Sequence, residues 1–226
     1  MPKTSPVLSL RARGPLACFT RPELKAERVS YPVMTPSAAR GLIEAVLWKP
    51  AIRWRVHRIQ VLRPIRFVSF RRNEVNSKAP SPARKLVDEG GQPPTLYADD
   101  DRAQRNTVAL RDVDYLIDAS FEMTERAGPA DNVSKFVEIF ERRLAKGQTF
   151  HQPYLGSREL AADVLPANDA PPPIDESRDL GLILWDVEFR AEGNRPLFFA
   201  ARLEGGVLDV PLDPAASFAM PSGSPR

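Results

Sequence analysis

The stretch from Tyr31 to Phe70 constrains the fold most, because it joins a helix signal directly to a strand signal. Thr35 is a favourable helix N-cap, and Pro36 follows at the first helical position, where a missing N–H costs no hydrogen bond. Apolar residues then recur at helical spacing as far as Leu47. The sequence therefore predicts a helix over residues 36–47 with one face in a core.

A strand with one basic face is predicted directly after this helix. Three apolar residues alternate with three basic ones, namely Ile52, Trp54 and Val56 with Arg53, Arg55 and His57. Such a strand places its apolar side on a core and its cations in solvent. The apolar face continues at Ile59 and Val61, so the parity changes near His57, which indicates a β-bulge.

Alternating apolar residues predict further strands over residues 7–13, 113–122, 183–189 and 197–203. Gly14-Pro15 is expected to end the first of these, and Gly205-Gly206 to turn the last into another strand over 207–210. A second helix begins near residue 133 after Asp131 or Asn132 as its N-cap. Short extended pieces are expected around residues 152–160.

The order of these elements predicts an α+β fold, with a ferredoxin-like (RRM-type) βαββαβ domain followed by a small antiparallel β-sheet subdomain. We expect residues 1–160 to form the RRM-type RNA-binding domain. Within it, the polar, Pro- and Gly-rich residues near 73–106 predict a mobile insertion. Residues 161–226 are expected to form the β-sheet subdomain and a loose tail from Pro214.

The charge of the chain is divided unevenly along its length. The net charge is +3, but residues 1–72 carry +12 and residues 73–226 carry −9. A basic segment of this kind predicts a polyanion partner, because bound cations release the counterions of a phosphate backbone. The residues predicted to contact RNA are Arg11, Arg13, Arg21, Lys25, Arg28, Tyr31, Lys49, Arg53, Arg55, Arg66, Arg71 and Arg72.

Two aromatic residues of the long connection after the first strand allow two interpretations. Phe19 and Tyr31 could stack on the bases of a single RNA strand, or they could pack at the edge of the core. The sequence leaves both open.

Several protein classes are excluded by composition and motifs. Cys18 is the only cysteine, so the chain has no internal disulfide framework and no multi-cysteine zinc site. No G-x-x-x-x-G-K-[ST], H-E-x-x-H or G-x-S-x-G motif occurs, and we expect no metal and no cofactor. No apolar run reaches the ~18 residues of a membrane span, and the N-terminus lacks a signal-peptide pattern. We therefore expect no membrane partner and place the protein in the cytoplasm.

Several phrases of the sequence are shared with one family: CFTRPELKAERVSYPVMTPSAARG, WKPAIRW, VLRPIRF, RRNEV, LGSRE and LEGGV. The chain resembles Cas5 of type I-C CRISPR systems, also called Cas5d or Cas5c, from about Leu10 to Val210. The resemblance implies an RRM-like N-terminal domain and a small C-terminal β-sheet domain. It also implies that the protein cuts the CRISPR repeat RNA without metal and holds the 5′ handle of the guide RNA in the interference complex.

Metal-independent cleavage uses the neighbouring 2′-hydroxyl as nucleophile and leaves a 2′,3′-cyclic phosphate. It needs a base, an acid and a cation near the phosphate. The resemblance implies that these groups are an aromatic or His residue just before WKP and a Lys-His pair at the start of the second helix. Here those positions are Leu47, Lys135 and Phe136. Lys135 can stabilise charge, but the other two side chains cannot transfer a proton.

The sequence therefore leaves the cleavage residues open. His57 and His151 are the only histidines, and Tyr31 and Tyr154 are weaker candidates. Besides Lys135, we expect His57 as a catalytic candidate. The alternatives to a cleaving Cas5 are a handle-binding subunit that does not cut, and a general nucleic-acid-binding protein that also takes duplex DNA.

Overall fold

The structure is a computed structural model that describes residues 3–24, 26–77, 88, 90, 97–190 and 193–218. Its elements in chain order are β1 (Leu8–Ala17), β2 (Arg28–Val29), α1 (Pro36–Val46), β3 (Ile52–Val61), β4 (Phe67–Val75), β5 (Arg102–Met123), α3 (Val133–Ala145), β6 (Asp163–Pro166), β7 (Arg178–Glu188), β8 (Arg195–Glu204), β9 (Val207–Asp209) and the 3-10 helix η1 (Pro214–Phe218). The fold is mixed α/β and is dominated by an antiparallel sheet, which confirms the predicted class at that level.

Helices α1 and α3 begin where local sequence signals predict. The Thr35 hydroxyl accepts a hydrogen bond from the Ala38 backbone N–H at 3.3 Å and caps α1. At the start of α3 the cap is Asn132 rather than Asp131, and its side chain accepts from the Lys135 backbone N–H at 2.9 Å. Each cap satisfies an N–H group that has no partner within its helix.

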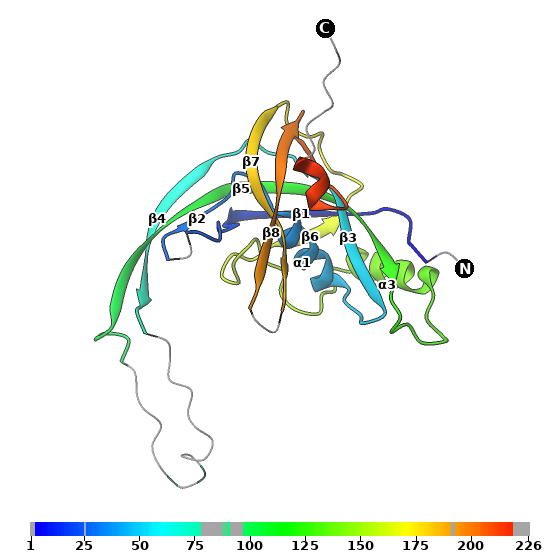
Figure 1. Ribbon diagram of the computed structural model, residues 1–226, viewed down its shortest axis with the longest axis horizontal. Helices are drawn as coiled ribbons and strands as arrows, with labels where there is room; N and C mark the ends of the chain where they lie inside the picture. The colour runs from blue at the N-terminus through cyan, green and yellow to red at the C-terminus, as the bar shows by residue number, and fades with distance from the viewer. Residues whose placement is uncertain are drawn as a thin grey trace.

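The described strands form one nine-stranded sheet in the order β6-β1-β5-β3-β9-β8-β7, and β2 and β4 also pair with β5 (Figure 1). Strand β5 pairs antiparallel with β1, β3 and β4, and parallel with β2. It is therefore the central strand of the fold.

Both helices pack on one face of the sheet, which we call the helix face. The Trp54 indole N–H of β3 donates to the Leu47 carbonyl at the end of α1 at 2.8 Å. The Trp54 ring centroid also lies 5.1 Å from that of Phe140 in α3. The Phe121 ring of β5 lies edge-on to Phe136 of α3 at 6.3 Å. Among the residues that the structure describes, no α-helix lies on the opposite side of β1, β3 and β5, and we call that side the open face.

One predicted irregularity within a strand is confirmed, and one predicted strand end is wrong. The bulge in β3 is confirmed by a register shift between Val56 and Arg58. Strand β1, however, does not end at Gly14-Pro15 but continues to Ala17 along β5. The ladder tolerates Pro15 because it lies opposite Asp112, which has a positive φ of 52° and breaks the regular pairing there.

The predicted insertion near 73–106 begins and ends inside regular strands. Strand β4 runs to Val75, which pairs with Arg102 at the start of β5. The two strands therefore form a long arm that reaches away from the helices (Figure 1). The two ends of the predicted insertion therefore lie in paired strands, although these residues lack an apolar pattern. Residues 78–87, 89 and 91–96 of the insertion lie outside the described residues.

The last strands extend the same sheet. The β8–β9 hairpin turns at Gly205-Gly206, both with positive φ, as predicted. Strand β9 then pairs with β3 at Arg58, Ile59 and Gln60, which joins the β7–β8 hairpin to the main sheet. Strand β6 lies beyond residue 160 and pairs with β1 at the other edge. The tail expected to be loose from Pro214 begins with η1, and residues 219–226 lie outside the described ones.

Candidate nucleic-acid interface

Polar residues of β1, β3 and β5 alternate along each strand with the residues that point to the helix face, so their side chains lie on the open face. Strand β5 contributes Asp114, Asp118 and Glu122, which alternate with its buried apolar residues. Each carboxylate accepts hydrogen bonds from a neighbouring strand or loop. The open face is therefore a hydrogen-bonded polar surface.

Asp114 is the most deeply buried of these carboxylates, with 1% of its side chain exposed. The Arg11 guanidinium donates to both of its oxygens, at 2.9 and 2.7 Å. These two bonds raise the pKa of Arg11 above its ordinary value, and Arg11 also donates to the Asp169 carbonyl at 3.0 Å. A buried carboxylate held by a bidentate guanidinium fixes both side chains in one geometry.

More arginines surround this pair and form what we call the arginine patch: Arg11, Arg13, Arg63, Arg66 and Arg111. Arg63 approaches Asp114 at 3.9 Å, and Arg111 approaches Asp112 at 3.8 Å. Both arginines are more than half exposed. A shallow cavity of about 270 Å³ lies between Arg63, Arg66 and Asp112. The patch thus presents several solvated guanidinium groups around two aspartates.

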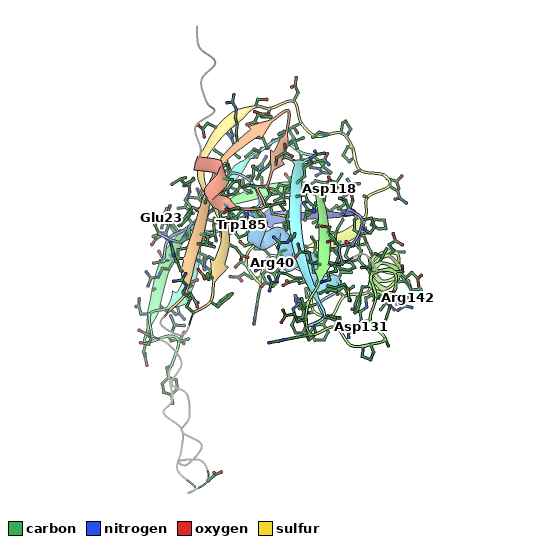
Figure 2. The ribbon with its side chains drawn as sticks, turned by 45° about the vertical axis from the view of Figure 1, so that its right-hand side comes forward. Glu23, Arg40, Asp118, Asp131, Arg142 and Trp185 are labelled. Atoms are coloured by element: carbon green, nitrogen blue, oxygen red, sulfur yellow. The ribbon has the colours of Figure 1, made fainter. Side chains whose placement is uncertain are left out.

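The three basic residues predicted on β3, namely Arg53, Arg55 and His57, differ in whether their side chains have partners. Arg55 pairs with Glu122 at 2.8 Å, and the His57 Nε2 atom lies 2.7 Å from the Ser120 hydroxyl. Arg53 is exposed and has no side-chain partner among the described residues. Arg53 lines a cavity of about 460 Å³ between β3, the start of α1 and β7. Arg40, which pairs with Asp186, and Trp185 line the same cavity (Figure 2). Only Arg53 of this row is free to meet a phosphate without breaking a contact.

The predicted cations on β1, β2 and the connecting loop are mostly paired. Arg13 lies 3.5 Å from Asp163 with both side chains well exposed. Arg28 bonds Ser157 at 2.9 Å and Glu159 at 2.7 Å. Lys25 lies outside the described residues. Lys49 is exposed just after α1.

Tyr31 differs from the expectation that it stacks on RNA. It is 1% exposed and lies in the core, with the Arg21 guanidinium 4.7 Å above its ring. Phe19 is buried as well, at 3%. Neither ring has a free face on which a base could stack, so the structure favours the packing interpretation.

The cations of β4 point to opposite sides of the arm. Arg71 is exposed. Arg72 instead bonds Glu74 and Thr107, and burial together with the nearby charge of Arg28 lowers the pKa of Arg72. Arg72 thus belongs to a structural cluster with Arg28, and Arg71 remains available on the arm.

The three positions expected to cut RNA do not form a site. Leu47 is 0% exposed and Phe136 is 2% exposed, and both belong to the core beneath the sheet. Lys135 is exposed at the first turn of α3, where its Nζ atom lies 2.9 Å from Asp131. Leu47 at the C-cap of α1 and Phe136 in α3 therefore serve packing.

Both histidines lie outside these positions. His57 is half-buried on the open face, in contact with Ser120. His151 is exposed after α3, and its Nδ1 atom lies 3.2 Å from the Gln152 carbonyl oxygen. Among the described residues, no group of three or more His, Cys, Asp or Glu side chains could hold a metal ion.

Two members of the arginine patch were missed from the sequence. Arg63 precedes a proline and Arg111 flanks Asp112, and neither lies in an alternating strand pattern. Their approach to Asp114 and Asp112 depends on how distant strands pair. The only local signal was the run of Arg and Pro from 63 to 66.

A family model described as CRISPR-associated protein (Cas_Cas5) matches residues 7–211. A protein named CRISPR pre-crRNA endoribonuclease Cas5d from Mannheimia succiniciproducens is 46% identical over 213 residues, covering 90% of this chain and 94% of its own. A protein of the same name from Thermus thermophilus is 41% identical over 224 residues, covering 91% and 92% of the two chains.

Solved structures share the fold at low sequence identity. A crystal structure of a CRISPR-associated protein superposes with a TM-score of 0.68 at 20% identity, covering 95% of this chain and 96% of that one. A functionally uncharacterized protein from Streptococcus mutans gives 0.67 at 20% identity, covering 96% and 97%. These two likenesses concern the fold alone.

Proposed function

Because the chain belongs to the Cas5d family of CRISPR-associated proteins, we propose that it binds the CRISPR repeat RNA, cuts it, and holds the resulting 5′ handle. Two relatives that match nine-tenths of this chain at 41–46% identity carry the name pre-crRNA endoribonuclease. The remaining subunits of a type I-C interference complex are its proposed protein partners.

The observation that supports RNA binding most directly is the arginine patch. Guanidinium groups form paired hydrogen bonds with phosphate oxygens. Arg63, Arg66 and Arg111 are all exposed; the first two line one shallow cavity with Asp112, and Arg111 lies 3.8 Å from that same aspartate. The Arg11–Asp114 pair beneath them holds the strands that carry the patch. Arg53 and Arg71 extend the available cations along β3 and the β4–β5 arm.

We infer that β1, α1, β3, β5, α3 and β6 form a ferredoxin-like, RRM-type unit. Its support is the strand order β6-β1-β5-β3 with antiparallel neighbours and both helices on one face. We also propose a division near residue 160 between this RNA-binding unit and the unit that carries β7, β8 and β9.

The open face differs from a sheet that reads bases by stacking. RRM sheets stack bases on aromatic residues of their exposed face. On the described part of the open face most side chains are instead arginines, carboxylates, hydroxyls and the Gln60 amide, together with Leu116 and the His57 ring. The proposed binding mode is therefore phosphate contact by arginines, which fixes position along the RNA, with bases read elsewhere.

The proposed reaction is attack of a 2′-oxygen on the adjacent phosphorus with release of the 5′-oxygen of the next nucleotide. It yields a 2′,3′-cyclic phosphate and a 5′-hydroxyl, and it needs no redox partner. A cytoplasmic location is part of this proposal. No described helix is long and apolar enough to span a membrane.

The test combines a gel shift with 5′-handle release on repeat hairpin RNA in EDTA. The patch variant is Arg63→Ala/Arg66→Ala/Arg111→Ala, and its matched control removes three exposed arginines elsewhere, Arg142→Ala/Arg195→Ala/Arg202→Ala. Loss of three phosphate contacts should lower the slope of log affinity against log salt by about two to three, with little change in the control. Equal affinity and slope in the two variants would refute the patch as the binding surface.

The same assay separates the alternatives. Binding of repeat RNA without any cleavage product would indicate a subunit that holds the 5′ handle but does not cut. Equal competition by unrelated duplex DNA at physiological salt would indicate a general nucleic-acid-binding protein.

A further inference from the structure

A short segment after α3 crosses the outer surface of α1 and carries three neighbouring rings. The Phe150 backbone N–H donates to the Ala45 carbonyl of α1 at 2.7 Å. The ring centroids of Phe150 and His151 are 6.2 Å apart, and those of His151 and Tyr154 are 6.4 Å apart. Phe150 is 78% exposed, so this row of rings faces solvent on the side of α1.

His151 is an exposed histidine with a ring nitrogen free to exchange protons with a ligand. With Nδ1 protonated, its N–H donates to the Gln152 carbonyl at 3.2 Å, which leaves Nε2 without a protein partner among the described residues. His57 differs, because its Nε2 atom is held by Ser120 on the open face. An exposed imidazole is the side chain best suited to transfer protons near neutral pH.

Glu44 of α1 lies beside this segment and next to an arginine. Its carboxylate is 3.7 Å from Arg40, one helical turn earlier, and Arg40 also pairs with Asp186 of β7. Burial raises the pKa of Glu44, and the charges of Arg40 and His151 act in the opposite direction. The Glu44 carboxylate is therefore half-buried, and three ionisable groups act on it: the Arg40 guanidinium, the His151 imidazole and the Asp186 carboxylate.

A small cavity lies along α1 beside Tyr154, the last ring of this row. It measures about 260 Å³ and lies between the small residues Ser37, Ala38 and Gly41 and the ring of Tyr154. A Cβ atom at Gly41 would meet nothing within 4 Å, so the helix surface there is open. The space suits one unpaired nucleotide beside an aromatic ring rather than a duplex.

The segment that carries the rings is held in place by close backbone contacts. The Cys18 N–H donates to the Leu155 carbonyl at 3.0 Å. Gly156 has a positive φ of 87°, and a Cβ atom there would lie 2.1 Å from the Cys18 carbonyl oxygen. Only glycine permits this approach, so Tyr154 and its neighbours are fixed against the end of β1.

We propose that His151 and Glu44 are the acid–base pair that cleaves RNA in this protein, with Arg40 as the adjacent cation. The inference rests on the proposed endoribonuclease function. The Glu44 carboxylate accepts the proton of the attacking 2′-hydroxyl, and the 2′-oxygen forms a bond to phosphorus. The bond from phosphorus to the 5′-oxygen breaks, and the imidazolium form of His151 donates its Nε2 proton to that leaving oxygen. Charge and atoms balance without a metal or a redox partner.

The test follows cleavage and binding of repeat hairpin RNA in EDTA by wild-type protein, His151→Ala and Glu44→Gln. Both variants should lose cleavage by about 100-fold or more, the contribution typical of general acid–base groups, and should bind RNA as wild type does. The matched control is Glu141→Gln, an exposed carboxylate on α3. Thermal unfolding midpoints within a few degrees of wild type establish that the variants are folded.

A modified substrate distinguishes an acid from a merely structural histidine. Replacing the bridging 5′-oxygen at the cut with sulfur gives a leaving group that departs without protonation. Cleavage of this substrate should be restored in His151→Ala and remain lost in Glu44→Gln.

Cleavage by wild type together with unchanged rates in both variants would overturn the assignment and leave the proposed function standing. Loss in His57→Ala but not in His151→Ala would also overturn it and move the site to the open face. RNA binding without any cleavage by wild type would overturn both this assignment and the cutting step of the proposed function.

Discussion

Replacing Phe136 with alanine should cost about 4 kcal/mol of unfolding free energy and leave the rate of RNA cleavage per folded molecule unchanged. The side chain is 2% exposed, and its ring meets Phe121 edge-on at 6.3 Å. The prediction distinguishes a core residue from the proton-transferring residue that family resemblance places at this position.

The magnitude follows from what the ring buries. Transfer of a fully buried Phe side chain is worth roughly 2–3 kcal/mol, and an edge-on aromatic pair adds about 1 kcal/mol. The cavity left beneath the sheet brings the total into the range of about 3–5 kcal/mol seen for Phe→Ala in cores. A domain with about 5–15 kcal/mol of stability would remain folded at low temperature.

The assay is urea unfolding followed by tryptophan fluorescence, paired with cleavage measured at low temperature. The neighbouring control is Lys135→Ala, whose exposed ammonium group pairs with Asp131 at 2.9 Å. That change should cost at most about 1 kcal/mol, as exposed ion pairs do. A stable Phe136→Ala protein that no longer cuts RNA would refute the reasoning.

Three further perturbations test the open face, the Arg28 cluster and the ring-bearing segment. Asp114→Asn should cost about 3 kcal/mol in urea unfolding, because Arg11 loses both carboxylate bonds, whereas Asp163→Asn in an exposed pair should cost under about 1 kcal/mol; equal costs would contradict this. Bonds from Ser157 and its own backbone N–H, helped by Arg28, lower the pKa of Glu159 from 4.5 to about 2, so Glu159 contributes stability above pH 4.5 that is lost as the pH falls toward 2. Urea midpoints of Glu159→Gln should therefore fall less steeply over that interval than those of wild type, and parallel curves would argue against the contribution. Gly156→Ala should destabilise the protein by well over the ~1 kcal/mol expected for Gly147→Ala. Both glycines have positive φ, but a Cβ atom would lie 2.1 Å from a backbone oxygen only at Gly156. Similar shifts of the melting temperature in the two variants would count against the clash.

Local signals were sufficient for the helices and for the β8–β9 hairpin. Thr35 and Pro36 define the start of α1 through one capping bond and one missing donor. The Gly205-Gly206 turn follows from the positive φ that both residues adopt. Such features depend on a few consecutive residues, so a single sequence is enough to predict them.

The arm and the pairing of charges could not be predicted in this way. Residues 102–110 of β5 pair with β4 while much of their surface is exposed, so no apolar alternation marks them as a strand. The partner of Arg11 lies in β5, and the partner of Arg40 lies in β7. Such contacts depend on strand register between distant segments, which composition and periodicity do not encode.

The same long-range pairing has a consequence for synthesis of the chain on the ribosome. Residues 1–72 carry a net charge of +12, and Arg28, Arg40 and Arg58 each pair with a carboxylate far later in the chain, at Glu159, Asp186 and Asp209. The nascent polypeptide therefore emerges as a polycation well before its counter-charges are translated, and its sheet cannot close until β6 and β9 have left the exit tunnel. Completion of the native sheet therefore has to wait for the last of these strands.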